Sequence, residues 1–129
     1  MSFRTFRDYL TERGENVIRA WLDGLPKNAK VKIDRRILYL ENVQYLQREP
    51  QYIKPLTGYD GIFEIRVILQ NIQYRPLGCY GPAQDEFTLL IGAIERGNRF
   101  EPRDAPDLAL QRKEIIHNDR SRTCVHFDY

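Results

Sequence analysis

Three apolar runs in the middle of the chain constrain its fold more than any other feature. The runs cover residues 62–69, 72–80 and 87–94. In the first run, apolar residues alternate with Glu64 and Arg66, which is typical of a strand with one buried face. The two-residue link Gln70-Asn71 and the loop 81–85 are both short. The sequence therefore predicts an antiparallel meander of three strands.

The second and third runs predict strands at different positions in the sheet. Pro76 has no N–H to donate to a sheet ladder, so we expect the second strand to bulge or to lie at an edge there. Residues 87–94 are apolar on both faces, as expected of a central strand.

Helical patterns flank the meander. Residues 16–22 have apolar residues spaced along one helical face, with Gly24 as the expected C-cap and Trp21 as an expected core residue. Residues 26–47 predict a longer amphipathic helix, and its basic residues are expected to form a solvated face. A last helix is expected to begin near Pro106.

The two ends of the chain give weaker patterns. Residues 3–10 predict a short strand or an irregular edge, and residues 119–129 show no clear period. The expected fold is therefore a small α+β domain spanning residues 1–129, with a C-terminal tail of unknown role. Whether that tail folds back over a site or stays disordered is left open.

Composition excludes few partners. Lys and Arg number 20 and Asp and Glu 18, for a net charge of +2, so binding to nucleic acid requires basic groups concentrated on one face. No apolar run approaches the roughly 18 residues of a membrane span, and the N-terminus has no apolar signal core, so we expect a cytoplasmic protein. The spacing of the two cysteines and two histidines fits no common zinc site, and no cofactor motif is present.

Arginines recur at or near the ends of the three strand-like runs, as Arg66, Arg75 and Arg96. A sheet can gather such residues onto one surface although they are far apart in sequence. The planar guanidinium group donates hydrogen bonds in a geometry that matches phosphate. This pattern favours a phosphate-binding surface. The alternative is a set of ordinary surface ion pairs, such as one between Glu64 and Arg66, each worth about 0–1 kcal/mol.

The order of these motifs resembles the RelE/ParE superfamily of type II toxin–antitoxin toxins, and most closely its phage-derived HigB-like branch. The resemblance rests on Leu56-Thr-Gly58, Phe63-Glu-Ile-Arg66, Tyr74-Arg75 and the basic segment that ends at Pro102. It implies a small twisted antiparallel sheet with two N-terminal helices packed on it. It also implies metal-independent mRNA cleavage, often on the ribosome, and a small antitoxin partner, often of the helix-turn-helix type.

The resemblance also implies roles for individual residues. Arg66, Arg75 and Arg96 are expected around the scissile phosphate, and Lys54, Arg99 and Arg103 on neighbouring phosphates. The proton acceptor is expected to be Glu64 or Glu95, while His117 and His126 stay open as alternatives.

Two other functions stay open. One is inhibition of DNA gyrase without catalysis, as in the ParE branch. The other is a phage-derived protein that keeps the fold without the activity. The second follows from Glu95-Arg96, which stands where HigB-like toxins commonly carry two lysines.

Overall fold

The structure, a computed structural model, describes residues 2–128 and contains three helices and two sheets within that range. The helices are α1 (Val17–Asp23), α2 (Lys27–Asn42) and α3 (Ala105–Asn118), with 3₁₀ turns η1 (Leu46–Arg48) and η2 (Arg120–Arg122). The strands are β1 (Thr5–Tyr9), β2 (Ile53–Pro55), β3 (Phe63–Ile65), β4 (Val67–Leu69), β5 (Ile72–Tyr74), β6 (Leu77–Tyr80), β7 (Glu86–Ile91), β8 (Ile94–Arg96), β9 (Arg99–Glu101) and β10 (Thr123–Val125). The predicted α+β class is confirmed.

Each of the three predicted strands is divided into two, and the halves join different sheets. The six-stranded sheet has the order β10-β1-β7-β6-β3-β2, and the four-stranded sheet has the order β4-β5-β8-β9. The interruptions fall at Arg66, at Arg75-Pro76 and at Gly92-Ala93. A main-chain hydrogen bond still joins two of these interruptions, since the Arg75 N–H donates to the Ala93 carbonyl at 2.8 Å.

The interruptions have identifiable causes. Pro76 cannot continue the ladder, as the sequence predicts, and its carbonyl accepts a hydrogen bond from the Ile65 N–H at 2.9 Å. A Cβ atom on Gly92 would lie 1.9 Å from Trp21 Cδ2, so the indole ring packs directly on the glycine backbone. Gln70 and Asn71 both have positive φ angles, 52° and 64°, as in the type I′ turn that suits a two-residue hairpin.

Two expectations need correction. The expected short strand is present at residues 5–9, but it is an interior strand of the six-stranded sheet and pairs in parallel with β7, so the sheet is not wholly antiparallel. The long helix α2 ends at Asn42 because Val43 takes up an extended conformation, whereas the sequence pattern predicted a helix reaching residue 47.

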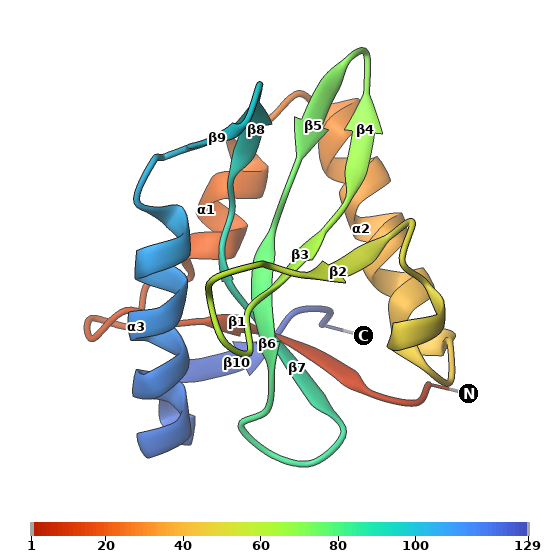
Figure 1. The fold of residues 1–129 in the computed structure, drawn as a ribbon. Helices are drawn as coiled ribbons and strands as arrows, with labels where there is room; N and C mark the ends of the chain where they lie inside the picture. Colours follow the sequence, from red (N-terminus) through yellow and green to blue (C-terminus); the bar gives the residue numbers. More distant parts are fainter. Residues whose placement is uncertain (1, 129) are drawn as a thin grey trace.

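The sheets separate two apolar cores. On one face, α1 and α2 pack through residues such as Ile18 and Ile37 against Phe6, Ile65 and Tyr74. On the other face, α3 packs on a second cluster; its buried members include Ile62, Leu77, Ala93, Ala109 and Ile116. Figure 1 shows α1 and α2 behind the strands and α3 at the left.

The last residues pack on the sheet. Strand β10 pairs antiparallel with β1, with Thr123 opposite Tyr9 and Val125 opposite Arg7. Within the predicted C-terminal tail, residues 120–122 form the turn η2 and Thr123–Val125 form an edge strand. Among residues 2–128, no helix is long and apolar enough to cross a membrane.

Candidate functional site

Five polar side chains meet where the strands are interrupted. Arg75 Nε lies 3.1 Å from Glu95 Oε1 and 3.3 Å from Glu64 Oε2. Arg66 Nε donates to the same Glu64 oxygen at 3.0 Å. The Arg75 guanidinium also donates to the side-chain oxygen of Gln73. We call Glu64, Arg66, Gln73, Arg75 and Glu95 the arginine cluster.

Strand alternation decides which face carries the cluster. Tyr74 belongs to the core under α1 and α2, where its ring centroid lies 6.4 Å from that of Trp21. Gln73 and Arg75, the neighbours of Tyr74 along the chain, therefore face the opposite side of the sheet. Glu64 is paired across the strands with Leu77, which belongs to the core under α3. The cluster thus lies on the α3 face of the sheet.

Arg75 is the most enclosed member of the cluster. Its side chain is 2% exposed, and its nitrogens contact two carboxylates, the Gln73 side chain and the Tyr74 carbonyl. A guanidinium group with its donors engaged in this way holds its acceptors in fixed positions. The arrangement makes Arg75 the centre of the cluster, with protein acceptors in the places where a phosphate would bind.

The outer members of the cluster are more accessible. The side chain of Arg66 is 34% exposed and that of Glu95 is 23% exposed, against 11% for Glu64. Arg36 of α2 donates to the Arg66 carbonyl and lies 3.8 Å from the centre of the Tyr52 ring. Burial lowers the pKa of Arg36. Its hydrogen bond fixes the backbone at Arg66 from the side of the sheet that carries α2.

Four further cations were predicted to bind phosphate, and the structure places them in different environments. Arg96 lies on the β8–β9 hairpin, 58% exposed, and its Nε pairs with Glu101 at 2.9 Å. Lys54 is exposed on β2, directly opposite Glu64 in the strand register. Arg99 and Arg103 are exposed, and within residues 2–128 neither guanidinium makes a hydrogen bond or an ion pair.

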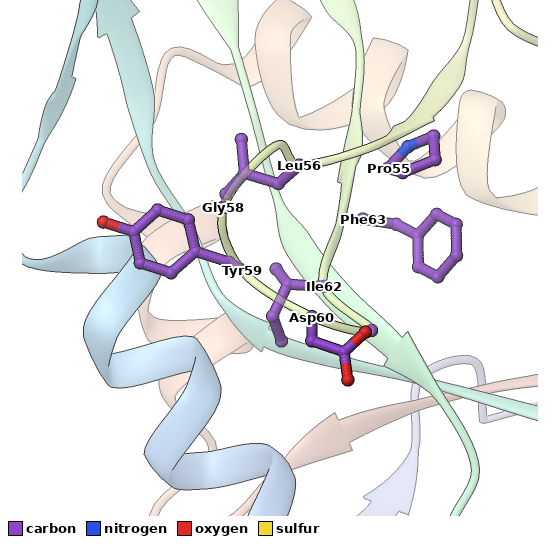
Figure 2. A pocket seen from close by; sticks show the side chains of 8 residues that line it. Pro55, Leu56, Gly58, Tyr59, Asp60, Ile62 and Phe63 are labelled. Atoms are coloured by element: carbon purple, nitrogen blue, oxygen red, sulfur yellow. The ribbon is translucent and has the colours of Figure 1, made fainter.

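The loop that joins β2 to β3 borders this face. Most of its residues, together with Pro55 and Phe63 at its two ends, line a shallow pocket of about 410 Å³, and Figure 2 shows Tyr59 extending from the loop toward α3. The Leu56 N–H donates to the Ile62 carbonyl at 2.8 Å, and Lys113 Nζ of α3 donates to the Asp60 carbonyl at 3.0 Å. The Leu56-Thr-Gly58 motif is therefore part of a closed loop docked on α3.

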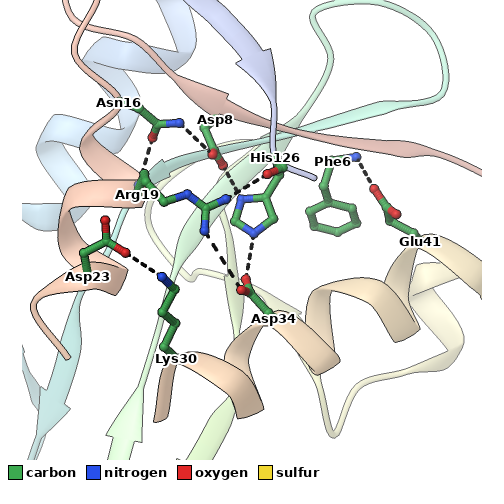
Figure 3. Close-up of polar contacts among 9 residues, drawn as sticks. All are labelled: Phe6, Asp8, Asn16, Arg19, Asp23, Lys30, Asp34, Glu41 and His126. Carbon is green, nitrogen blue, oxygen red and sulfur yellow. Dashed lines mark hydrogen bonds and ion pairs between the residues drawn. The ribbon is translucent and has the colours of Figure 1, made fainter. Parts of the chain in front are cut away.

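A second polar cluster lies on the other side of the sheet. His126 Nδ1 is 2.7 Å from Asp8 Oδ1, and its Nε2 is 2.8 Å from Asp34 Oδ1 of α2 (Figure 3). Arg19 donates to the His126 carbonyl at 2.8 Å, and Asn16 donates to Asp8 at 2.9 Å. We call these five residues the histidine cluster.

The histidine cluster holds a positive charge inside the fold. Burial lowers the pKa of His126, but the hydrogen bonds to Asp34 and Asp8 outweigh it and raise that pKa to about 9. The imidazole side chain is 0% exposed, so a substrate has no access to it. His117, the other histidine open as a proton acceptor, is exposed on the last turn of α3, where its ring lies against Gly81. Neither histidine contacts the arginine cluster.

Burial raises the pKa of the Cys79 thiol to about 12, which disfavours the reactive thiolate. Within residues 2–128, no group of three or more His, Cys, Asp or Glu side chains has the geometry of a metal site.

Sequence reasoning missed several residues of these clusters. Gln73 has a signal, because it lies two residues before Arg75 in the predicted strand of residues 72–80, on the same face. Asp8 and Asp34 have none, since they meet His126 across sequence separations of 118 and 92 residues.

The chain was also compared with known proteins. Residues 20–114 match the family described as "Phage derived protein Gp49-like (DUF891)", which covers more than half of the chain. No curated protein and no solved structure matches at a significant level. The chain therefore belongs to the phage-derived Gp49-like family, a family of the toxin–antitoxin (RelE-like toxin) type.

Proposed function

We propose that this protein is the toxin of a type II toxin–antitoxin pair and cleaves mRNA without a metal. It acts in the cytoplasm on messages held by ribosomes, as a single domain spanning residues 1–129. The observation that carries the proposal is the arginine cluster, which lies on the α3 face of the sheet close to exposed cations. The RelE/ParE and HigB-like resemblance of the motifs agrees with this reading.

RNA cleavage by a 2′-hydroxyl forms a bond from the 2′-oxygen to phosphorus and breaks the bond to the 5′-oxygen. It requires a proton acceptor for the hydroxyl, cations around the phosphate and a proton for the departing 5′-oxygen, which water can supply. We assign the acceptor role to Glu95, because it is the more exposed carboxylate of the cluster and, within residues 2–128, its carboxylate contacts only Arg75 among the cluster's side chains. Glu64 is less open, and one of its oxygens already contacts both Arg66 and Arg75. A carboxylate within reach of the hydroxyl contributes about 10²–10⁴-fold to such a reaction.

Arg66 is the arginine of the cluster that we assign to the phosphate, and Arg96, on the exposed β8–β9 hairpin, is a second contact that the family resemblance implies. Arg66 has a third of its side chain exposed, and Arg96 makes an exposed pair with Glu101 that a phosphate can displace at little cost. Removing one preorganised donor of this kind costs about 3–4 kcal/mol in the transition state. Arg75 then acts as a positioning residue that holds Glu64 and Glu95 in place.

The partner of such a toxin is a cognate antitoxin, of the helix-turn-helix type in this proposal. It neutralises the toxin by covering the basic surface around Lys54, Arg99 and Arg103. Those three cations have no acidic partner within residues 2–128, and an acidic antitoxin segment would supply one.

The test is induced expression of the intact chain in bacteria, with primer extension on a long, abundant transcript. The double variant Arg66→Ala/Arg96→Ala removes both phosphate-contacting arginines. Its matched control is Lys27→Ala/Arg35→Ala, which removes two exposed cations of α2. The proposal predicts growth arrest with discrete cuts in translated regions, which the first double variant loses and the control keeps.

Other outcomes overturn the proposal in distinct ways. Arrest without cuts that persists in Arg66→Ala/Arg96→Ala points to inhibition of gyrase or another target by binding alone. Absence of both arrest and cuts points to a protein that keeps the fold without the activity.

A further inference from the structure

A second pocket lies beside the arginine cluster, between the β2–β3 loop and the β8–β9 hairpin. It encloses about 400 Å³, which falls within the range of small-molecule sites. Leu56 and Tyr59 line it from the loop, and Phe100 lines it from β9. All three side chains are half-buried against the apolar cluster under α3. We call this the hairpin pocket.

The hairpin pocket adjoins the arginine cluster. Phe100 is directly opposite Glu95 in the register of β8 and β9, so the two side chains share one face of the sheet. Glu95 Oε1 is in turn 3.1 Å from Arg75 Nε. A molecule seated between Tyr59 and Phe100 therefore lies one strand away from the carboxylate assigned as proton acceptor.

The charges of the hairpin pocket favour an anionic ligand. Of the described residues that line it, Arg99 and Arg103 carry a positive charge and none carries a negative charge. Neither guanidinium has a hydrogen-bond or ion-pair partner within residues 2–128. Asn98, also in the lining, offers an amide that can both donate and accept hydrogen bonds.

We propose that the hairpin pocket receives one unstacked nucleobase of the RNA strand. The base stacks on Tyr59 and packs against Phe100, and Arg99 and Arg103 hold the adjoining phosphates. Recognition of single-stranded RNA commonly combines an aromatic platform with arginines in this way, because every base has a flat face that stacks. The inference rests on the proposed function and adds a base-binding subsite to it.

The probe is a 2′-O-methyl hexanucleotide of mixed sequence, which cannot be cleaved through its 2′-oxygen. One 2-aminopurine is moved through the six positions, and its fluorescence is followed as the full-length protein is added. A base that stacks in the pocket gives strong quenching at one position only. Replacing the base at that position by an abasic unit weakens binding by about tenfold, as expected for the loss of one stacked base.

The variants identify the pocket as the site of stacking. Tyr59→Leu keeps an apolar side chain against the core but removes the ring, and it is expected to abolish the quenching and weaken binding about tenfold. The abasic RNA should bind this variant no more weakly than the intact RNA does, because the same contact is lost. Tyr59→Phe should restore both signals. Tyr39→Leu, which removes an exposed tyrosine of α2, should change neither.

Two results would overturn the inference. If Tyr59→Leu and Phe100→Leu, shown to be folded by thermal unfolding, quench and bind like the original protein, the base lies elsewhere while RNA binding stands. If the original protein does not bind the hexanucleotide even at low salt, the subsite fails, whereas the proposed cleavage on ribosomes stands or falls with the primer-extension result.

Discussion

The protein contains two ionic clusters that have the same arrangement of charges but differ in how exposed they are to solvent. In each, a buried cation is held between two carboxylates: Arg75 between Glu64 and Glu95, and His126 between Asp8 and Asp34. The imidazole is 0% exposed, whereas Arg66 and Glu95 leave one side of the arginine cluster accessible.

This difference in exposure is the basis for assigning different roles to the two clusters. The histidine cluster joins β1, α2 and the segment after β10, and each ring nitrogen is used to connect them. It therefore stabilises the fold. The arginine cluster lies where three strands are interrupted and borders a pocket lined by Arg99 and Arg103, which have no ionic partner within residues 2–128. It is the cluster to which the proposed binding and cleavage of a phosphodiester are assigned.

The largest expected effect on stability comes from removing His126, the buried cation of the histidine cluster. His126→Ala leaves the fully buried Asp8 without its charged partner and should cost about 3–5 kcal/mol in the free energy of unfolding. Denaturant unfolding measures it. His117→Ala, which removes the exposed histidine of α3, should change stability by less than about 0.5 kcal/mol. Equal losses in the two variants would show that the histidine cluster does not hold the fold.

The same cluster should make stability depend on pH. Because folding raises the pKa of His126 from 6.5 to about 9, its contribution is complete below pH 6.5 and is lost as pH rises through about 9. The free energy of unfolding should fall across that interval by an amount on the order of 3 kcal/mol. The difference between this curve and that of His126→Gln isolates the term. A flat difference curve would contradict the assignment.

The two carboxylates of the arginine cluster, Glu64 and Glu95, should differ in how much their removal lowers the cleavage rate. Glu95→Gln preserves the size of the side chain but removes the proton acceptor, and should lower the cleavage rate by about 100-fold with little change in RNA binding. Glu101→Gln, which alters the exposed partner of Arg96, should change the rate by only a few-fold. Single-turnover cleavage measures both. A larger loss in Glu64→Gln than in Glu95→Gln would transfer the acceptor role to Glu64.

The smallest expected effect is on RNA affinity, from a cation at the periphery of the arginine cluster. Lys54 is exposed and unpaired within residues 2–128, so Lys54→Ala should weaken RNA binding several-fold without changing the rate of the chemical step. The slope of log affinity against log salt concentration should fall by about 0.7, the value for one phosphate contact on single-stranded RNA. An unchanged slope would remove Lys54 from the RNA path.

The parts predicted from sequence are those governed by local patterns. Helical spacing predicts α1 and α2, a two-residue link predicts the turn at Gln70-Asn71, and the missing N–H of Pro76 predicts the interruption beside Arg75. Alternation along one strand places Glu64 and Arg66 on the same side.

Long-range pairing accounts for what local patterns missed. Residues 5–9 are an interior strand because β10 and β7 pair with its two edges, and β10 is too short to show a period. Asp8 is a charged residue in that interior strand, and only the distant His126 explains its burial. The division of the strands at Gly92 likewise depends on the Trp21 ring, which comes from α1.

One measurement compares the two clusters directly: cleavage of ribosome-bound mRNA by equal amounts of folded protein, for Arg66→Ala and for His126→Gln. Below its unfolding temperature, His126→Gln should cleave at nearly the original rate, because the histidine cluster lies on the far side of the sheet. Arg66→Ala should lose about 100-fold or more, as expected for one donor to the transition state. Full cleavage by folded Arg66→Ala would contradict the account.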